Sequence, residues 1–183
     1  MNYLILSDIH GSAPALRQVL DFYDKGNYDM LLLLGDLLNY GPRNGLPEGL
    51  DAQAVAKMLN ERAKDIVAVR GNCDSEVDQM LLHFPMMDTC ALVCDSAHRL
   101  LLTHGHVYGE NNLPPAPGFD ILFQGHTHLW KLEPASDGKP TICNTGSPTF
   151  PKGGKLPTFA TLEEGTLAVR SLDGTVLKQI VAF

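Results

Sequence analysis

Short apolar runs that alternate with helical patterns constrain the fold of the first half of the chain most strongly. Tyr3–Leu6 is a strand candidate, and Met30–Leu34 is an uninterrupted apolar run that suits a strand buried on both faces. Leu16–Tyr23 places its apolar residues at positions i, i+3, i+4 and i+7, which indicates one apolar face of a helix. Ala52–Lys64 has a second helical pattern, and Ile66–Val69 is a third strand candidate. The first half therefore has a βαβαβ order.

The second half changes to strands after one short predicted helix, Glu76–Leu82. Turn residues separate the apolar runs, and Asp137-Gly138 and Asp173-Gly174 are typical of hairpin turns. The predicted strands are Ala91–Cys94, Leu100–Thr103, Ile121–Gln124, Thr141–Asn144, Phe159–Leu162, Leu167–Ser171 and Val176–Val181. We expect a single α/β domain, residues 1–183, with two stacked mixed β-sheets flanked by helices. Three Pro- and Gly-rich segments, Asn39–Leu50, Asn111–Gly118 and Gly146–Pro157, are predicted to be loops that shape a binding site.

Residues of metal-ligand type follow five of the predicted strands directly. In open α/β sheets, ligands bind in the crevice at the carboxyl ends of the strands, so these residues are expected to meet at one edge. The five clusters are Asp8-Ile9-His10, Gly35-Asp36, Gly71-Asn72-Cys73-Asp74, Thr103-His104-Gly105-His106 and Gly125-His126-Thr127-His128.

Taken singly, most of these signals have an ordinary explanation. Asp36 could be a turn former or helix cap, Asn72 a turn residue, and His104 a buried histidine with satisfied hydrogen bonds. Gly-His-x-His is the exception, because about 2% of chains of this composition would contain it by chance. The joint occurrence at five strand ends favours a metal site. A set of carboxylate, amide and imidazole donors suits Mn²⁺, Fe²⁺, Zn²⁺ or Co²⁺ better than Mg²⁺ or Ca²⁺.

The motif order D-x-H, G-D, G-N, H-G-H, G-H-x-H resembles the calcineurin-like metallophosphoesterase superfamily over the whole chain. Finer details, such as Gly41-Pro42-Arg43-Asn44 and Gly71-Asn72-Cys73-Asp74, resemble small bacterial phosphodiesterases of the YfcE type. The resemblance implies two divalent cations bridged by Asp36, with Mn²⁺ the first choice and Zn²⁺, Fe²⁺, Co²⁺ or Ni²⁺ as alternatives. It assigns Asp8, His10, Asp36 and His128 to the first cation, and Asp36, Asn72, His104 and His126 to the second.

The chain departs from the wider superfamily at Cys73. The third motif of the superfamily usually contains a His at this position, which assists the leaving group. A thiol is a weaker proton donor than imidazolium near neutral pH. The resemblance therefore implies hydrolysis of diesters with good leaving groups rather than of alkyl monoesters.

The implied activity is that of a metal-dependent phosphodiesterase, in which a hydroxide bridging two cations attacks phosphorus. The residues expected to act in catalysis are Asp36, Asn72, His104, His106 and Cys73. His106 either contacts substrate phosphate or only forms hydrogen bonds behind the ligands. Arg43 is a weaker candidate for substrate contact, since an exposed loop position explains it as well.

The sequence leaves two other classes of function open. A metal-binding scaffold is one, because a retromer subunit of this fold acts mainly in that way. A purely structural metal site, with no open coordination position, is the other. Occupation of all seven ligand positions by competent side chains favours an enzyme.

Composition narrows the partners. The net charge is −7, and no cluster of Lys and Arg exceeds two residues, which disfavours a nucleic-acid polymer or an anionic membrane as partner. We expect a small phosphodiester substrate, with a homo-oligomer left open. No signal peptide or spanning segment is apparent, which predicts a cytoplasmic location. Cys90 and Cys94 are expected to be buried thiols.

Overall fold

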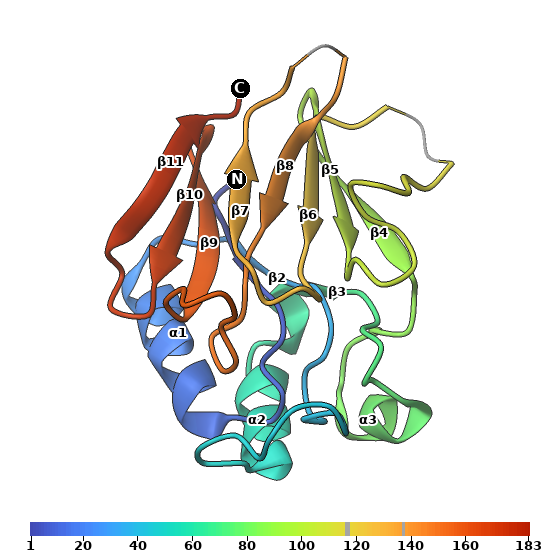
Figure 1. Cartoon of the computed structure of the whole chain (residues 1–183), viewed down its shortest axis with the longest axis vertical. Helices are drawn as coiled ribbons and strands as arrows, with labels where there is room; N and C mark the ends of the chain where they lie inside the picture. The colour runs from blue at the N-terminus through green and yellow to red at the C-terminus, as the bar shows by residue number, and fades with distance from the viewer. Residues whose placement is uncertain (116–117, 137) are drawn as a thin grey trace.

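In the computed structural model, which describes residues 1–115, 118–136 and 138–183, two mixed β-sheets stack against each other (Figure 1). The helices are α1 (Ala13–Lys25), α2 (Ala52–Asn60), α3 (Glu76–Leu81) and a short 3-10 helix, Ala63–Asp65. The strands are β1 (Tyr3–Leu6), β2 (Met30–Leu33), β3 (Ile66–Ala68), β4 (Cys90–Asp95), β5 (His98–Thr103), β6 (Ile121–Gln124), β7 (Lys131–Glu133), β8 (Thr141–Asn144), β9 (Thr158–Glu163), β10 (Thr166–Ser171) and β11 (Val176–Val181).

Each sheet contains three parallel strands whose carboxyl ends lie together. The first sheet has the order β11-β10-β9-β1-β2-β3, with β1, β2 and β3 parallel. The second has the order β4-β5-β6-β8-β7, with β5, β6 and β8 parallel. Stacking of the two sheets brings these carboxyl ends to one side of the molecule, and this is where the ligand-type residues follow the strands.

The core has two main layers because the residues of the central strands point alternately to opposite faces. Towards α1 and α2 the first sheet packs Leu4, Leu6, Leu31 and Leu33 against Leu16, Val19, Leu20, Val55 and Leu59. Between the sheets lie Tyr3, Ile5, Leu32, Leu34, Leu100, Leu102, Ile121 and Phe123. The run Met30–Leu34, predicted as a strand buried on both faces, forms β2; the strand ends at Leu33, and its Leu31, Leu32 and Leu33 are buried while Met30 is half-buried. The predicted fold of two mixed sheets with flanking helices is confirmed.

Several predicted details differ from the structure. The helix predicted as Ala52–Lys64 ends at Asn60, and the chain turns through Ala63–Asp65 before β3. Strand β7 was not predicted, since its three residues pair with β8 without an apolar pattern of their own. The predicted burial of the thiols on β4 is wrong: Cys90 is half-buried and Cys94 is exposed, because β4 is the edge strand of its sheet.

The two predicted hairpin turns have different outcomes. Asp173-Gly174 joins the antiparallel strands β10 and β11, with Gly174 at φ +88° and its N–H donating to the carbonyl of Ser171. That turn is confirmed. In Asp137-Gly138, Asp137 lies outside the described residues. Of the helices in the described part of the chain, none has the length and apolar character needed to cross a membrane.

Candidate metal centre

The structure brings the seven predicted ligands together at the carboxyl ends of β1, β2, β3, β5 and β6. Five of them, Asp8, His10, Asp36, His104 and His128, are buried, whereas His126 is half-buried and Asn72 is exposed. The buried members form the floor of the site. The two more exposed members face the side from which a ligand can enter.

Five of the seven ligands have a left-handed backbone, which non-glycine residues rarely adopt. The φ angles are +57° at Asp8, +51° at His10, +55° at Asp36, +66° at His126 and +59° at His128. Such conformations cost free energy and persist where the surrounding structure imposes them, typically at functional sites. They also explain how Asp8 and His10, or His126 and His128, converge although they are two residues apart, since successive side chains of an extended strand would point to opposite faces.

Hydrogen bonds between the first two ligand segments hold this backbone in place. Beyond the ends of β1 and β2, the N–H of Asp8 donates to the carbonyl of Gly35 at 3.0 Å, and the N–H of His10 donates to the carbonyl of Asp36 at 2.9 Å. The parallel pairing of the strands therefore continues into the ligand segments. Its register places Asp8 and His10 opposite Asp36.

A buried carboxylate, that of Asp74, fastens the third ligand segment to the second. Its Oδ2 accepts hydrogen bonds from the backbone N–H of Asp36 at 2.8 Å and of Gly71 at 2.7 Å, and its Oδ1 accepts one from Leu37 at 2.9 Å. Burial, together with the negative charge of Asp36, raises the pKa of Asp74 to about 6. Asp74 is thus a positioning residue for Asp36, and both of its oxygens are engaged in that task.

Two glycines are required by close approach. A Cβ at Gly71 would collide with the carboxylate and backbone N of Asp36, and a Cβ at Gly125 would lie 2.5 Å from Oδ2 of Asp8. Gly35 has φ +95°, which favours glycine. The glycines that precede Asp36, Asn72 and His126 are therefore needed, either for a positive φ or for the close approach of a ligand carboxylate.

Backbone carbonyls orient three of the imidazoles. An Nδ1–H that donates to a carbonyl leaves Nε2 as the lone-pair atom, which is how metal-binding histidines are usually held. The three Nδ1–carbonyl pairs are His10 with Asn39 (2.9 Å), His104 with Leu34 (2.8 Å) and His128 with Phe150 (2.8 Å). All three Nε2 atoms are therefore available at the centre of the site.

Electron-pair donors face one another in the first half of the site. The Nε2 atoms of His10 and His128 are 3.2 Å apart, and Oδ1 of Asp8 lies 3.2 Å from the second and 3.6 Å from the first. Oδ1 of Asp8 is buried without a hydrogen-bond partner. Lone pairs that converge in this way repel unless a cation lies among them, so the residues fit a bound metal ion.

A second group of donors shares Asp36 with the first. Oδ2 of Asp36 is 3.7 Å from Nε2 of His10 and 3.5 Å from Nε2 of His104. Oδ1 of Asn72 lies 3.1 Å from the same Nε2 of His104, and the rings of His104 and His126 are 5.1 Å apart. Asp36 thus lies between the two groups of donors.

The pKa values of Asp8 and His10 show that the first half of the site attracts positive charge. Burial alone would raise the pKa of Asp8, but the adjacent imidazoles of His10 and His128 hold it well below its usual range. Burial would lower the pKa of His10, yet the adjacent carboxylate of Asp8 raises it. Burial and the neighbouring His104 lower the pKa values of His106 and His126. Protons and metal ions therefore compete for the same atoms.

The remaining predicted residues lie around this centre. The backbone N–H of Cys73 donates to Oδ1 of Asp36 at 2.7 Å, and burial together with the charge of Asp36 raises the pKa of the Cys73 thiol to about 12. His106 is exposed, stands edge-on to His104 at 5.2 Å and faces a small neighbouring cavity of about 220 Å³. Arg43 is exposed and lines the main cavity.

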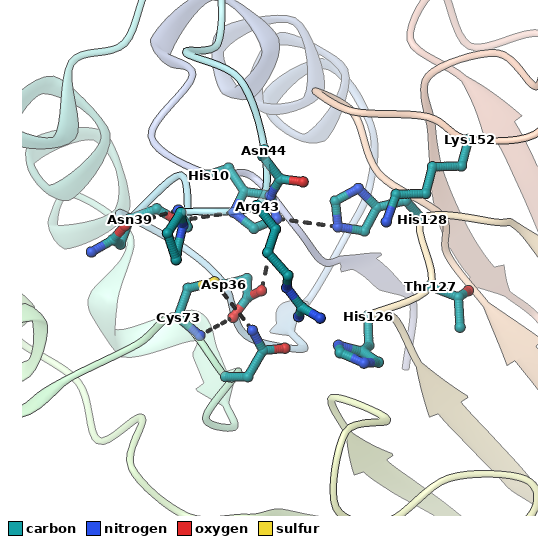
Figure 2. A pocket seen from close by; sticks show the side chains of 13 residues that line it. His10, Asp36, Asn39, Arg43, Asn44, Cys73, His126, Thr127, His128 and Lys152 are labelled. Carbon is teal, nitrogen blue, oxygen red and sulfur yellow. Dashed lines mark hydrogen bonds and ion pairs between the residues drawn. The ribbon is translucent and has the colours of Figure 1, made fainter.

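The main cavity has a volume of about 630 Å³ and opens directly onto the donors (Figure 2). Sequence reasoning gave no role to six of its lining residues, which are Asn39, Gly41, Pro42, Asn44, Thr127 and Lys152. Only an unspecific signal pointed to them: five belong to the predicted loops 39–50 and 146–157, and Thr127 lies between two predicted ligands. The predicted role of these two loops in shaping a site agrees with this lining.

Two stacked sheets with these ligand-bearing strand ends define a metallophosphoesterase. The profile of the calcineurin-like phosphoesterase superfamily domain matches residues 1–166, and the chain belongs to this superfamily. It is 46% identical over 181 residues to Phosphodiesterase YfcE of Escherichia coli K12, an alignment that covers 98% of this chain and 97% of that protein.

Solved structures agree with this assignment. A structure described as Yfce, a phosphoesterase from E. coli, has a TM-score of 0.95 and 44% identity, with all of both chains covered. Vps29 of Entamoeba histolytica complexed with Zn²⁺ has a TM-score of 0.66 and 21% identity over all of both chains. A novel archaeal phosphodiesterase has a TM-score of 0.64 and 20% identity, with 99% of both chains covered. The last two likenesses concern the fold alone.

Proposed function

We propose that this protein is a dinuclear-metal phosphodiesterase acting on a small phosphodiester. The observation that supports it most directly is the position of Asp36, whose Oδ2 lies within 3.7 Å of an Nε2 atom in each of two donor groups. The buried, unpartnered Oδ1 of Asp8 supports the same proposal. So does the similarity to Phosphodiesterase YfcE over nearly the whole of both chains.

The chain's own residues would divide the work as follows. Asp8, His10, Asp36 and His128 would hold the first cation, and Asp36, Asn72, His104 and His126 the second. When bound, two divalent cations supply an acidified water as nucleophile and positive charge for the phosphoryl oxygens. The more exposed Asn72 and His126 border the cavity, so substrate would meet the centre on their side. Mn²⁺ is our first choice, because the donors are mixed imidazole, amide and carboxylate groups.

Cys73 would limit the leaving groups that this site can expel. With its pKa raised to about 12, the thiol stays protonated near neutral pH and is a weak proton donor to a departing alkoxide. His106 is displaced towards the neighbouring cavity and does not line the main one. Diesters with good leaving groups, such as aryl diesters, would therefore be the better substrates.

A chelation and metal-titration experiment with bis(p-nitrophenyl) phosphate tests the proposal. We expect EDTA to abolish release of p-nitrophenolate, Mn²⁺ to restore it ahead of Mg²⁺, and metal analysis to find two equivalents per chain. Full turnover in excess EDTA would refute the metal mechanism. Two bound equivalents without turnover would instead favour the metal-binding scaffold.

A further inference from the structure

Two cationic side chains border the cavity without a role in the proposed chemistry. Arg43 comes from the loop that follows Asp36 and Lys152 from the loop that follows β8, and both line the cavity with the metal ligands. Among the described residues, neither side chain forms a hydrogen bond or an ion pair. By contrast, Arg62 and Lys131 are paired with the carboxylates of Asp24 and Glu110.

Hydrogen bonds fix both loops, so the backbone positions from which the two cationic side chains extend lie next to the centre. The side chain of Asn44 donates to the carbonyl of Tyr40 at 2.7 Å, next to Arg43. In the other loop, the hydroxyl of Ser147 donates to the carbonyl of Asp8 at 2.8 Å, and the N–H of Lys152 donates to the carbonyl of His128 at 3.0 Å. The segment that bears Lys152 is thus attached to two of the metal ligands.

The Arg43 side chain reaches towards the metal ligands. Figure 2 shows the Arg43 side chain extending over the pocket towards the region between Asp36 and His126. The guanidinium is therefore close enough to interact with an anion at the centre.

Charge balance argues that these cations serve a group other than the scissile phosphate. Two divalent cations leave the centre positive after the carboxylates of Asp8 and Asp36 are counted, and a phosphodiester carries a single negative charge. Arg43 and Lys152 add two further positive charges that such a substrate would leave unmatched. In the described part of the chain, the other side chains lining the cavity include neutral polar groups but no Phe, Tyr or Trp. This lining suits an ionic group better than a stacked ring or an acyl chain.

We propose that Arg43 and Lys152 bind a second anionic group of the substrate, so that the preferred substrate is a diester with a further phosphate or similar anion on the ester group that is not expelled. This inference rests on the proposed phosphodiesterase function and names the substrate class. Charge-assisted hydrogen bonds from guanidinium and ammonium groups to phosphate are the strong kind, and losing one reduces affinity by about tenfold or more.

Two substrates with the same leaving group isolate this effect. p-Nitrophenyl ethyl phosphate and p-nitrophenyl 2-phosphonoethyl phosphate both release p-nitrophenolate, and only the second has the additional anion. We expect kcat/KM of the metal-loaded protein to be at least about tenfold higher for the second. Arg43→Gln and Lys152→Gln should each reduce this ratio by about tenfold, and Arg43→Lys by less. Lys178→Gln, which removes an exposed charge on β11, should leave the ratio as it is.

A binding measurement separates this inference from the proposed function. Calorimetry with the metal-loaded protein should give a Kd for ethane-1,2-diphosphonate at least about tenfold lower than for ethylphosphonate, with the preference reduced in both Gln variants. If neither diester is hydrolysed but the preference is present, the proposed function fails and the anion site stands. A wild-type ratio near one in both assays overturns the inference. So does an equal loss on both substrates in the Gln variants, which would assign the cations to the scissile phosphate.

Discussion

Asp74 offers a sharp test of how the fold positions Asp36, the proposed bridging ligand. In Asp74→Asn, one carboxylate oxygen is replaced by an NH₂ group that cannot accept a hydrogen bond. At least one of the three backbone N–H groups, those of Asp36, Leu37 and Gly71, would then be left facing another donor. The remaining bonds would also lose their charge-assisted character.

The magnitude follows from the number of bonds. A hydrogen bond to a charged group contributes about 1.5–3 kcal/mol, and a buried donor without a partner costs about 1–3 kcal/mol. We therefore expect Asp74→Asn to lower the free energy of unfolding of the metal-free protein by about 2–4 kcal/mol. With a urea m-value of about 2 kcal/mol per molar, the midpoint should fall by roughly 1–2 M. Metal affinity should fall too, because the backbone of Asp36 is no longer held.

Urea unfolding followed by circular dichroism, together with metal analysis, measures both effects. Asp78→Asn is the matched control, because the buried carboxylate of Asp78 accepts a hydrogen bond from the backbone N–H of Ser75 at 2.7 Å and caps α3 without a hydrogen bond to any predicted ligand. It should lower stability without changing metal affinity. An Asp74→Asn protein with wild-type midpoint and two tightly bound metal equivalents would refute the positioning role.

Three further predictions concern the centre itself. Asp36→Asn should abolish turnover and lower metal occupancy at both sites, whereas Asp8→Asn should mainly empty the first site. Metal analysis checks both, and two full equivalents with normal turnover in Asp36→Asn would contradict the bridging role of Asp36. In the metal-free protein, the depressed pKa of Asp8 gives stability that is lost as pH falls through the acidic range. The raised pKa of His10 gives stability that is present below about pH 6.5 and is lost as pH rises through the pKa of His10 in the folded state. Stabilisation by Mn²⁺ should have the opposite trend to the His10 contribution and grow as pH rises above about 6–7, where the imidazoles are neutral. Tm measured against pH with and without Mn²⁺ checks this, and an increase in Tm on adding Mn²⁺ that does not grow with pH would contradict it. Cys73→His should raise kcat/KM for an alkyl monoester more than for an aryl diester, because general acid catalysis matters most for basic leaving groups. Cys73→Ala is the control. An equal loss of kcat/KM on both substrates in Cys73→His would show that the thiol has no part in substrate selectivity.

The structure limits what Asp74 could contribute in that last variant, although Asp74 is next to Cys73 in the chain. Both of its oxygens accept backbone hydrogen bonds from the Asp36 and Gly71 segments. A new imidazole would therefore have to take its orientation from another group, and its benefit would be smaller than a carboxylate-held ring would give.

The strands that the sequence predicted best are those with a clear apolar pattern of their own. Strands β1, β6, β8 and β11 have the predicted bounds. Strands β1 and β6 are mostly apolar segments that end just before ligand-bearing residues, which makes their ends easy to locate. Strand β7 left no pattern, since Lys131 and Glu133 are polar and only Leu132 is buried. Burial of the β4 thiols was mispredicted for a related reason: composition identifies a strand but not its place at the edge of a sheet.

The sequence by itself determined where the ligand-type residues emerge and in which order, because residues directly after short apolar runs lie at the carboxyl ends of strands. It did not determine which atoms of those residues face the centre. That depends on carbonyl groups distant in the chain: Nδ1 of His104 donates to the carbonyl of Leu34, and Nδ1 of His128 donates to that of Phe150. The hydrogen bond that the N–H of Asp36 donates to Asp74, and those between the ligand segments, likewise hold Asp36 in a left-handed conformation that its own preferences oppose. Tertiary structure decided these features, because a strained backbone and a chosen ring nitrogen are stabilised only by partners that the folded sheets bring into contact.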